Sequence, residues 1–147
     1  MGTALQATLL FPVFIGFAGL AIDTGWAYGA RTHLQDVADV SALAGVPATG
    51  NQANVRAAVR AISTANEVAG SPITIADADI ETGTWANGTF TPAAAGTYVR
   101  VTARRPALPM FLGGMFGVPT SNLTAVAIAG EGRAHPGDLA VHHVRRR

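Results

Sequence analysis

GLAIDTGWAYGARTHLQDVADVSALAG, residues 19–45, carries the clearest structural pattern in this chain. Its apolar side chains recur at the three- and four-residue spacing of a helix, and one stripe contains Leu34, Val37, Ser41 and Ala44. No turn signal separates it from the apolar residues that precede it. We therefore predict one helix of about 40 residues, which Pro47 ends because proline cannot continue the hydrogen-bond pattern.

The first half of this predicted helix is apolar on every side. Residues 3–22 carry no charge, and at about 1.5 Å per residue a run of this length spans about 30 Å, the thickness of a bilayer's hydrocarbon core. Pro12 lies inside the run, where a membrane helix tolerates it because side chains such as Thr8 can satisfy the freed carbonyl. We predict a transmembrane anchor over residues 1–25. A cleavable signal peptide and a buried helix of a soluble protein are the alternatives.

Polar and aromatic residues follow at the predicted edge of the membrane. Asp23 is the first charge, and it marks the end of the span or pairs with Arg31 or with another chain. Trp26 and Tyr28 have the amphipathic rings that favour the membrane–water boundary. Small residues allow close helix packing in lipid, Gly16 and Gly19 among them. The predicted membrane-helix and interface residues are thus Pro12, Gly16, Gly19, Asp23, Trp26, Tyr28 and Arg31.

After Pro47 the sequence changes from helical to strand-like patterns. A second helix is predicted over residues 52–69, with Gly70 and Pro72 after it. Asn87-Gly88 is a strong hairpin signal, which would place Trp85 opposite Phe90. A short helix lying on the sheet is expected over residues 106–118. The predicted strands are residues 73–75, 79–86, 89–91, 97–104 and 120–129.

Closely spaced strands imply an antiparallel sheet. We therefore predict an α+β fold in which the second half of the long helix and the second helix pack on an antiparallel sheet of about four strands. Residues 26–130 would form this domain outside the membrane, and residues 131–147 a flexible tail.

Composition argues against several classes of function. The net charge of +1 provides no field for nucleic acid, and the absence of cysteine excludes disulfides and thiolate chemistry. Asp77, Asp79 and Glu81 alternate, which on a strand would place them on one solvated face; a cation site there is the less favoured interpretation. Asp36 and Asp39 lie one helical turn apart without a basic neighbour. We predict no catalytic, cofactor-binding or metal-binding residues.

Three blocks of sequence resemble a known family. They are GTALQATLLFP (2–12), then GLAIDTGWAY (19–28) with RTHLQDVADVSALAG (31–45), and more loosely ETGTW (81–85), FTP (90–92), VRVT (99–102), PMF (109–111) and MFGV (115–118). The second block is the specific one. Together they resemble the TadE/TadG-like proteins of Tad (Flp) pilus-assembly systems, and TadG-like members most. A long helix whose second half packs on an antiparallel sheet is also the architecture of pilin-like proteins.

The resemblance implies a single-pass protein of the bacterial inner membrane whose C-terminal domain is extracytoplasmic, in the periplasm or at the cell surface. It implies a structural role in assembling a Tad/Flp-type pilus or related secretion apparatus, and no enzymatic activity. The implied partners are membrane lipid and other pilus-assembly or pilin-like proteins bound through the N-terminal helix, with a homo-oligomer or filament as a further possibility.

Two other functions remain open at this point. The first is a pilin-like subunit of an extracellular filament. Pilin subunits carry a glutamate early in this helix and the nearest residue here is Gln6, which favours an assembly factor. The second is a small signal-anchored binding module or enzyme, which would require a pocket with convergent polar groups.

Overall fold

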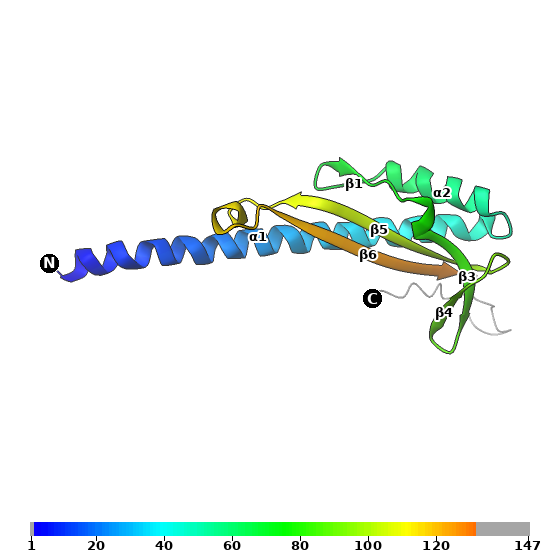
Figure 1. Cartoon of the computed structure of the whole chain (residues 1–147), viewed down its shortest axis with the longest axis horizontal. Helices are drawn as coiled ribbons and strands as arrows, with labels where there is room; N and C mark the ends of the chain where they lie inside the picture. The colour runs from blue at the N-terminus through cyan, green and yellow to red at the C-terminus, as the bar shows by residue number, and fades with distance from the viewer. Residues whose placement is uncertain (1, 132–147) are drawn as a thin grey trace, which may run out of the picture.

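A single helix, α1 (Gly2–Gly45), runs along the whole length of the molecule (Figure 1). The computed structural model describes residues 2–131. Pro12 lies within the helix, and the 3₁₀ turn η1 (Val46–Ala48), which contains Pro47, follows its end. The predicted continuous helix that ends at Pro47 is therefore confirmed.

The second helix, α2 (Gln52–Thr64), is shorter than predicted. It begins at Asn51, whose side chain accepts hydrogen bonds from the backbone N–H groups of Ala53 and Asn54. Residues 65–69 leave the helix because the chain turns back there. Strands β1 (Glu67–Val68) and β2 (Ser71–Pro72) pair across a turn in which Ala69 and Gly70 both have positive φ, 51° and 70°.

The main sheet has four antiparallel strands in the order β4–β3–β5–β6. A short 3₁₀ turn, η2 (Asp77–Asp79), precedes it. The hairpin at Asn87-Gly88 forms as predicted, and Trp85 lies opposite Phe90. The strands are β3 (Ile80–Ala86), β4 (Thr89–Pro92), β5 (Tyr98–Pro109) and β6 (Thr120–Gly130).

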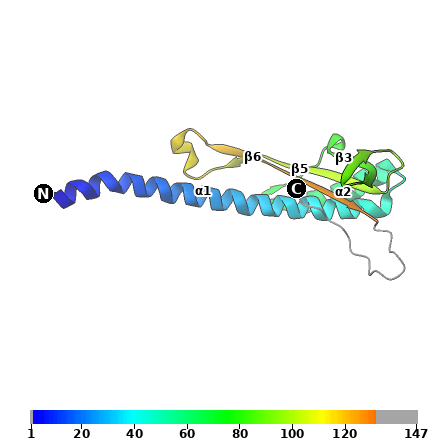
Figure 2. The same cartoon turned by 90° about the horizontal axis from the view of Figure 1, so that it is seen from below.

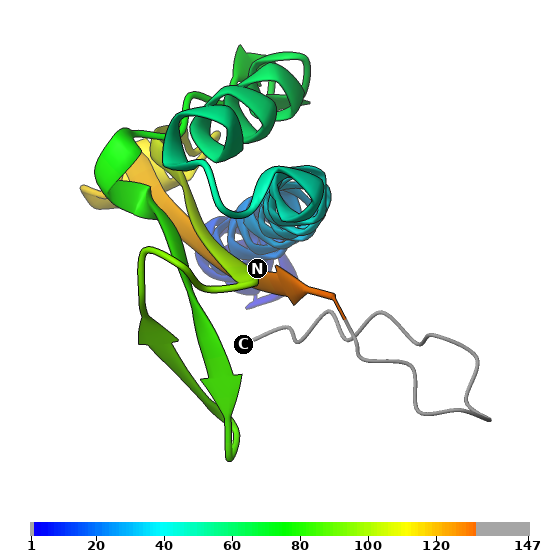
Figure 3. The same ribbon diagram turned by 90° about the vertical axis from the view of Figure 1, so that its right-hand side faces the viewer.

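The core lies between the second half of α1, α2 and the sheet. Seen end-on, both helices lie on the same face of the sheet (Figure 3), and the view from below shows β5 and β6 running along α1 (Figure 2). The largest fully buried apolar side chains are Leu34, Val55, Val59, Val68, Ile73, Ile75, Ile80, Val99, Val101 and Leu108. The predicted α+β fold, with two helices on a four-stranded antiparallel sheet, is confirmed.

Two predicted elements are wrong. Residues 73–75 form no strand; Ile73 and Ile75 fill the core from an extended segment that has no partner strand among the described residues. Residues 106–118 form no helix on the sheet, because β5 continues to Pro109 past an irregularity between Arg105 and Leu108. Only Gly113–Phe116 form a 3₁₀ turn, η3, and it contacts α1.

Candidate functional site

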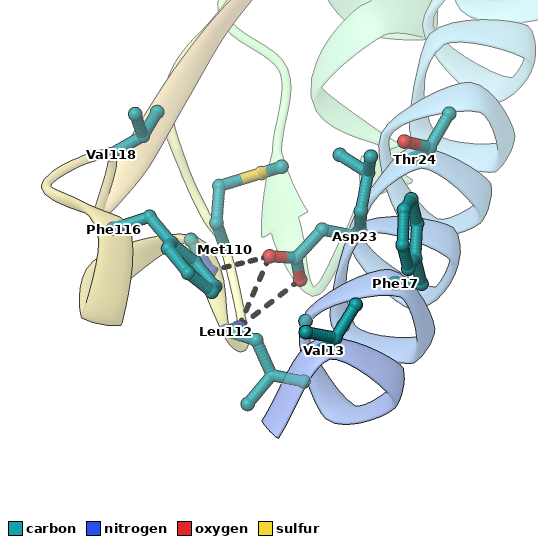
Figure 4. A pocket seen from close by; sticks show the side chains of 12 residues that line it. Val13, Phe17, Asp23, Thr24, Met110, Leu112, Phe116 and Val118 are labelled. Atoms are coloured by element: carbon teal, nitrogen blue, oxygen red, sulfur yellow. Dashed lines mark hydrogen bonds between the residues drawn. The ribbon is translucent and has the colours of Figure 1, made fainter. Parts of the chain in front are cut away.

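The connection between β5 and β6 meets α1 at Asp23. We call Met110–Val118 the η3 loop, and its contact with α1 the joint. Asp23 is 4% exposed, and its carboxylate accepts hydrogen bonds from three successive backbone N–H groups. Oδ1 lies 2.7 Å from the nitrogen of Phe111. Oδ2 lies 3.1 Å from the nitrogen of Leu112 and 2.6 Å from that of Gly113 (Figure 4).

Successive N–H groups that converge on one carboxylate form an anion-binding nest. Hydrogen bonds to an ionised acceptor are stronger than neutral ones, so this arrangement offsets the burial of the charge. The loop needs glycine at position 113, because a Cβ atom there would lie 2.4 Å from the carbonyl oxygen of Val118. Asp23 therefore positions the loop, and the backbone N–H groups of the loop, rather than a basic side chain, hydrogen-bond its carboxylate.

Small residues of α1 let the loop approach the helix closely. A Cβ atom added to Gly19 would lie 2.8 Å from Cδ1 of Leu112, and one added to Gly16 would lie 3.9 Å from the ring of Phe116. The glycines predicted to receive a neighbouring helix thus receive the chain's own loop. A larger residue at position 19 would push Leu112 away from α1.

Trp26 joins the same contact from the next turn of α1. Its Nε1 donates to the carbonyl oxygen of Pro109 at 3.2 Å, and its ring lies edge-on to Phe111, with the ring centroids 5.4 Å apart. The joint therefore combines a buried carboxylate, a close glycine contact and an aromatic pair. Each of these links α1 to the far end of the β5–β6 hairpin.

An open apolar pocket of about 470 Å³ lies between α1 and the η3 loop (Figure 4). Asp23 contributes its carboxylate, but those oxygens already bond the loop. The pocket suits apolar groups, since Asp23 and Thr24 are the only residues of its lining with a polar side chain. Its remaining lining includes Val13, Phe17, Leu20, Met110, Leu112, Phe116 and Val118.

The predicted interface residues separate into two groups. Gly16, Gly19, Asp23 and Trp26 meet in the joint, whereas Pro12, Tyr28 and Arg31 lie exposed on α1. Asp23 does not pair with Arg31, because the main chain of the η3 loop occupies its carboxylate. The apolar composition of residues 110–118 signalled that this segment needs an apolar neighbour. It did not indicate that the neighbour is α1.

The acidic run predicted to share one strand face does not do so. Asp77 and Asp79 belong to η2, and only Glu81 lies in β3. Asp77 pairs with Arg60, Asp79 lies 2.8 Å from Nη2 of Arg104, and Glu81 lies 2.8 Å from Nε of Arg100. The hydrogen bond from Arg104 holds the pKa of Asp79 below its ordinary value. Among residues 2–131 no group of three or more acidic or histidine side chains is arranged to hold a metal.

Comparison with known proteins identifies one family. A family model described as Tad-like Flp pilus-assembly matches residues 29–129, from the second half of α1 to the end of β6. No curated protein and no solved structure matches this chain.

Proposed function

Because this chain belongs to the Tad-like Flp pilus-assembly family, we propose that it is a membrane-anchored, extracytoplasmic component of a Tad/Flp-type apparatus. Membership supports a role in pilus assembly, and that role is structural rather than enzymatic. The matched residues do not include residues 2–28 of α1. Beyond family membership, we therefore propose the membrane anchor, the side of the membrane on which the domain lies, and the precise role.

The observation that carries the proposal is the exposure of the first half of α1. This half extends beyond the sheet (Figure 1). Outside the face that meets the η3 loop, its large apolar side chains are exposed, including Phe11, Phe14, Phe17, Leu20 and Ile22. The helical stretch Leu10–Ala48 is long and apolar enough, by length and composition, to cross a membrane. A soluble domain rarely exposes so large a contiguous apolar surface, whereas lipid removes its cost.

Among pilus-assembly roles, we favour a TadG-like assembly factor over a filament subunit. Gln6 is exposed on α1 and carries no charge where a pilin subunit has a glutamate. The chain would lie in the inner membrane with residues 26–130 outside the cytoplasm. The η3 loop covers Gly16 and Gly19, so these glycines are not available to a partner helix. Partner helices would instead contact the exposed side chains on the other faces of α1.

Fractionation of cells that express the full chain tests the anchor. We expect the protein in the membrane pellet after alkaline carbonate washing and its release by detergent alone. The paired substitutions Phe14→Arg and Phe17→Arg should shift it to the soluble fraction, because each arginine costs about 2.5–3.5 kcal/mol at the centre of a span. Thr89→Arg, on exposed β4, is the matched control and should stay in the pellet. A soluble wild-type protein with its N-terminus intact would contradict the anchor.

Two further measurements test orientation and role. Protease added to spheroplasts should digest the domain of residues 26–130; protection would place that domain in the cytoplasm. Electron microscopy of sheared surface material should show fibres that lack this chain as a major component. Abundant chain in the fibres would instead identify a filament subunit.

A further inference from the structure

The η3 loop carries the largest exposed apolar side chains outside α1. Phe111, Met115 and Phe116 are 66%, 76% and 67% exposed, and Val118 is also exposed. No charged residue occurs between Pro106 and Gly130. A tip of this composition is unfavourable in water, and its neighbours in the fold do not cover it.

The joint fixes the depth of this loop relative to α1. Leu112 lies against Gly19, Phe116 lies nearest Gly16, and the loop backbone bonds Asp23. The pocket between them extends along the helix to Val13, about 15 Å from Asp23 at the rise of a helix. Whatever surrounds residues 13–23 of α1 therefore also surrounds the loop.

Most backbone N–H groups of the η3 loop have a hydrogen-bond acceptor in the fold. The N–H groups of Phe111, Leu112 and Gly113 bond Asp23, and the remaining bonds close within the loop or its ends. Lipid offers no partners for free N–H groups, and irregular backbone is not exposed to the hydrocarbon core. The bonded loop backbone therefore fits the interfacial edge of the bilayer, where only its apolar side chains enter the acyl region. The donors that bond within the loop or its ends are the N–H groups of Met110, Met115, Gly117 and Val118.

We propose that the η3 loop is a second membrane contact, seated at the interfacial edge of the leaflet that holds residues 13–23 of α1, with its exposed apolar side chains in phospholipid. This inference rests on the proposed anchoring of α1. The supporting observation is continuity: the exposed apolar side chains of the loop extend the apolar surface of the adjoining helix turns. The polar residues between them are the bonded Asp23 and Thr24. Two attached points fix how far the domain stands from the membrane and how it is rotated about α1.

Trp26 fits this placement. It lies one turn beyond Asp23 and donates to Pro109, where β5 gives way to the loop. Tryptophan favours the membrane–water boundary. The bilayer surface would thus cross the molecule near Trp26, with the η3 loop on the lipid side and the sheet on the water side.

Site-directed fluorescence tests the placement, because the chain has no native cysteine. Met115→Cys reports on the loop, Phe14→Cys on the helix, and Thr89→Cys on the far end of the sheet. Each full-length variant carries an NBD label in vesicles of phosphatidylethanolamine and phosphatidylglycerol, at a low protein-to-lipid ratio. Quenching by doxyl-labelled lipid is compared with quenching by aqueous iodide. Phe116→Cys provides a second loop position if the first variant does not fold.

We expect the Met115 and Phe14 labels to be quenched several-fold more by doxyl lipid than by iodide, and the Thr89 label to show the reverse. A loop label quenched by iodide beside a lipid-quenched Phe14 label would overturn the loop contact and leave the anchor intact. A loop label shielded from both quenchers would mean that a second copy covers it, and would also overturn the proposal. A Phe14 label in water would overturn the anchor itself.

Discussion

The two halves of α1 differ in how they use apolar residues. In the second half, a stripe of small and medium side chains is buried against the sheet and α2: Ala30, Leu34, Val37, Ala38 and Ala42. In the first half, phenylalanine, leucine and isoleucine point outward on every face except the one that meets the η3 loop. One helix thus packs against a protein core along its second half and exposes most of its surface along its first half.

This difference shows that periodicity, rather than total hydrophobicity, reports what surrounds a helix. A one-sided stripe requires a partner on that side, and here the sheet and α2 provide it. A helix with large apolar side chains exposed on most of its surface requires an apolar surrounding, which we propose is lipid. Asp23 lies where the two patterns meet, and the η3 loop reaches it from the far end of the β5–β6 hairpin.

The largest expected effect is a loss of stability when a buried leucine in the second half of α1 is replaced, compared with an exposed leucine in the first half. Leu34 is 0% exposed and Leu20 is 64% exposed. In detergent micelles, Leu34→Ala should lower the free energy of unfolding by about 2–5 kcal/mol, because it leaves a cavity between helix and sheet. Leu20→Ala should change it by less than about 0.5 kcal/mol. Guanidinium denaturation followed by tryptophan fluorescence measures both, and equal losses would contradict the contrast between the halves.

Replacing Asp23 should weaken the joint, the contact between the η3 loop and α1. Asp23→Ala leaves three N–H groups of the η3 loop without an acceptor, so local opening should become easier by about 1.5–3 kcal/mol. Hydrogen exchange of the amides of residues 111–113 should accelerate by about 10–100-fold, whereas exchange in β3 should not change. Asp23→Asn, which retains one acceptor oxygen, should give an intermediate rate. Unchanged exchange in Asp23→Ala would show that the carboxylate does not hold the loop.

Two glycines of α1 should respond with opposite sign. A Cβ atom at Gly45 would lie 3.1 Å from Val59 and 3.2 Å from Val99, so Gly45→Ala should cost about 1–2 kcal/mol through overpacking. At Gly29 no atom lies within 4 Å, so Gly29→Ala should stabilise the helix by about 0.5–1 kcal/mol. Thermal unfolding of the two variants measures the signs. Stabilisation by both substitutions would mean that α2 and the sheet pack loosely on α1.

Local signals in the sequence predicted the elements that local chemistry determines. Proline at position 47 ends the long helix, and Asn87-Gly88 sets a two-residue turn that places Trp85 opposite Phe90. The errors at residues 73–75 and 106–118 have a common cause. Both segments are apolar because of tertiary neighbours, and short apolar runs resemble strands or helices until those neighbours are known.

For the same reason, the sequence predicts the α1 side of the joint but not the loop that contacts it. Gly16, Gly19, Asp23 and Trp26 were recognised as residues with a special position at the end of the apolar run. Their partners lie about ninety residues later in the chain. No pattern within α1 indicates that Asp23 bonds backbone N–H groups rather than Arg31. Such a pairing depends on the length of the β5–β6 hairpin, which is a property of the fold.

The smallest expected effect is that of replacing Asp79, a carboxylate with an arginine partner that is exposed to water. It contrasts with Asp23, the carboxylate of the joint. Asp79 accepts two hydrogen bonds from Arg104, whose side chain is 58% exposed. Water screens such a pair, so Asp79→Asn should cost less than about 1 kcal/mol at neutral pH. Because the bond with Arg104 lowers the pKa of Asp79 in the folded state, its contribution is present above the unfolded value, about 3.9. It is lost as pH falls through the lower, folded value.

The stability difference between wild type and Asp79→Asn should therefore be constant from neutral pH down to about pH 5, and should shrink below about pH 4. Denaturation curves recorded across this range measure it. Arg104→Gln should abolish the same acid-side dependence, because it removes the donor that lowers the pKa. A difference that grew on acidification would mean that the partner stabilises the protonated form instead. Asp23 has backbone donors in place of an arginine, so Arg104→Gln should leave the exchange of the η3 loop amides unchanged.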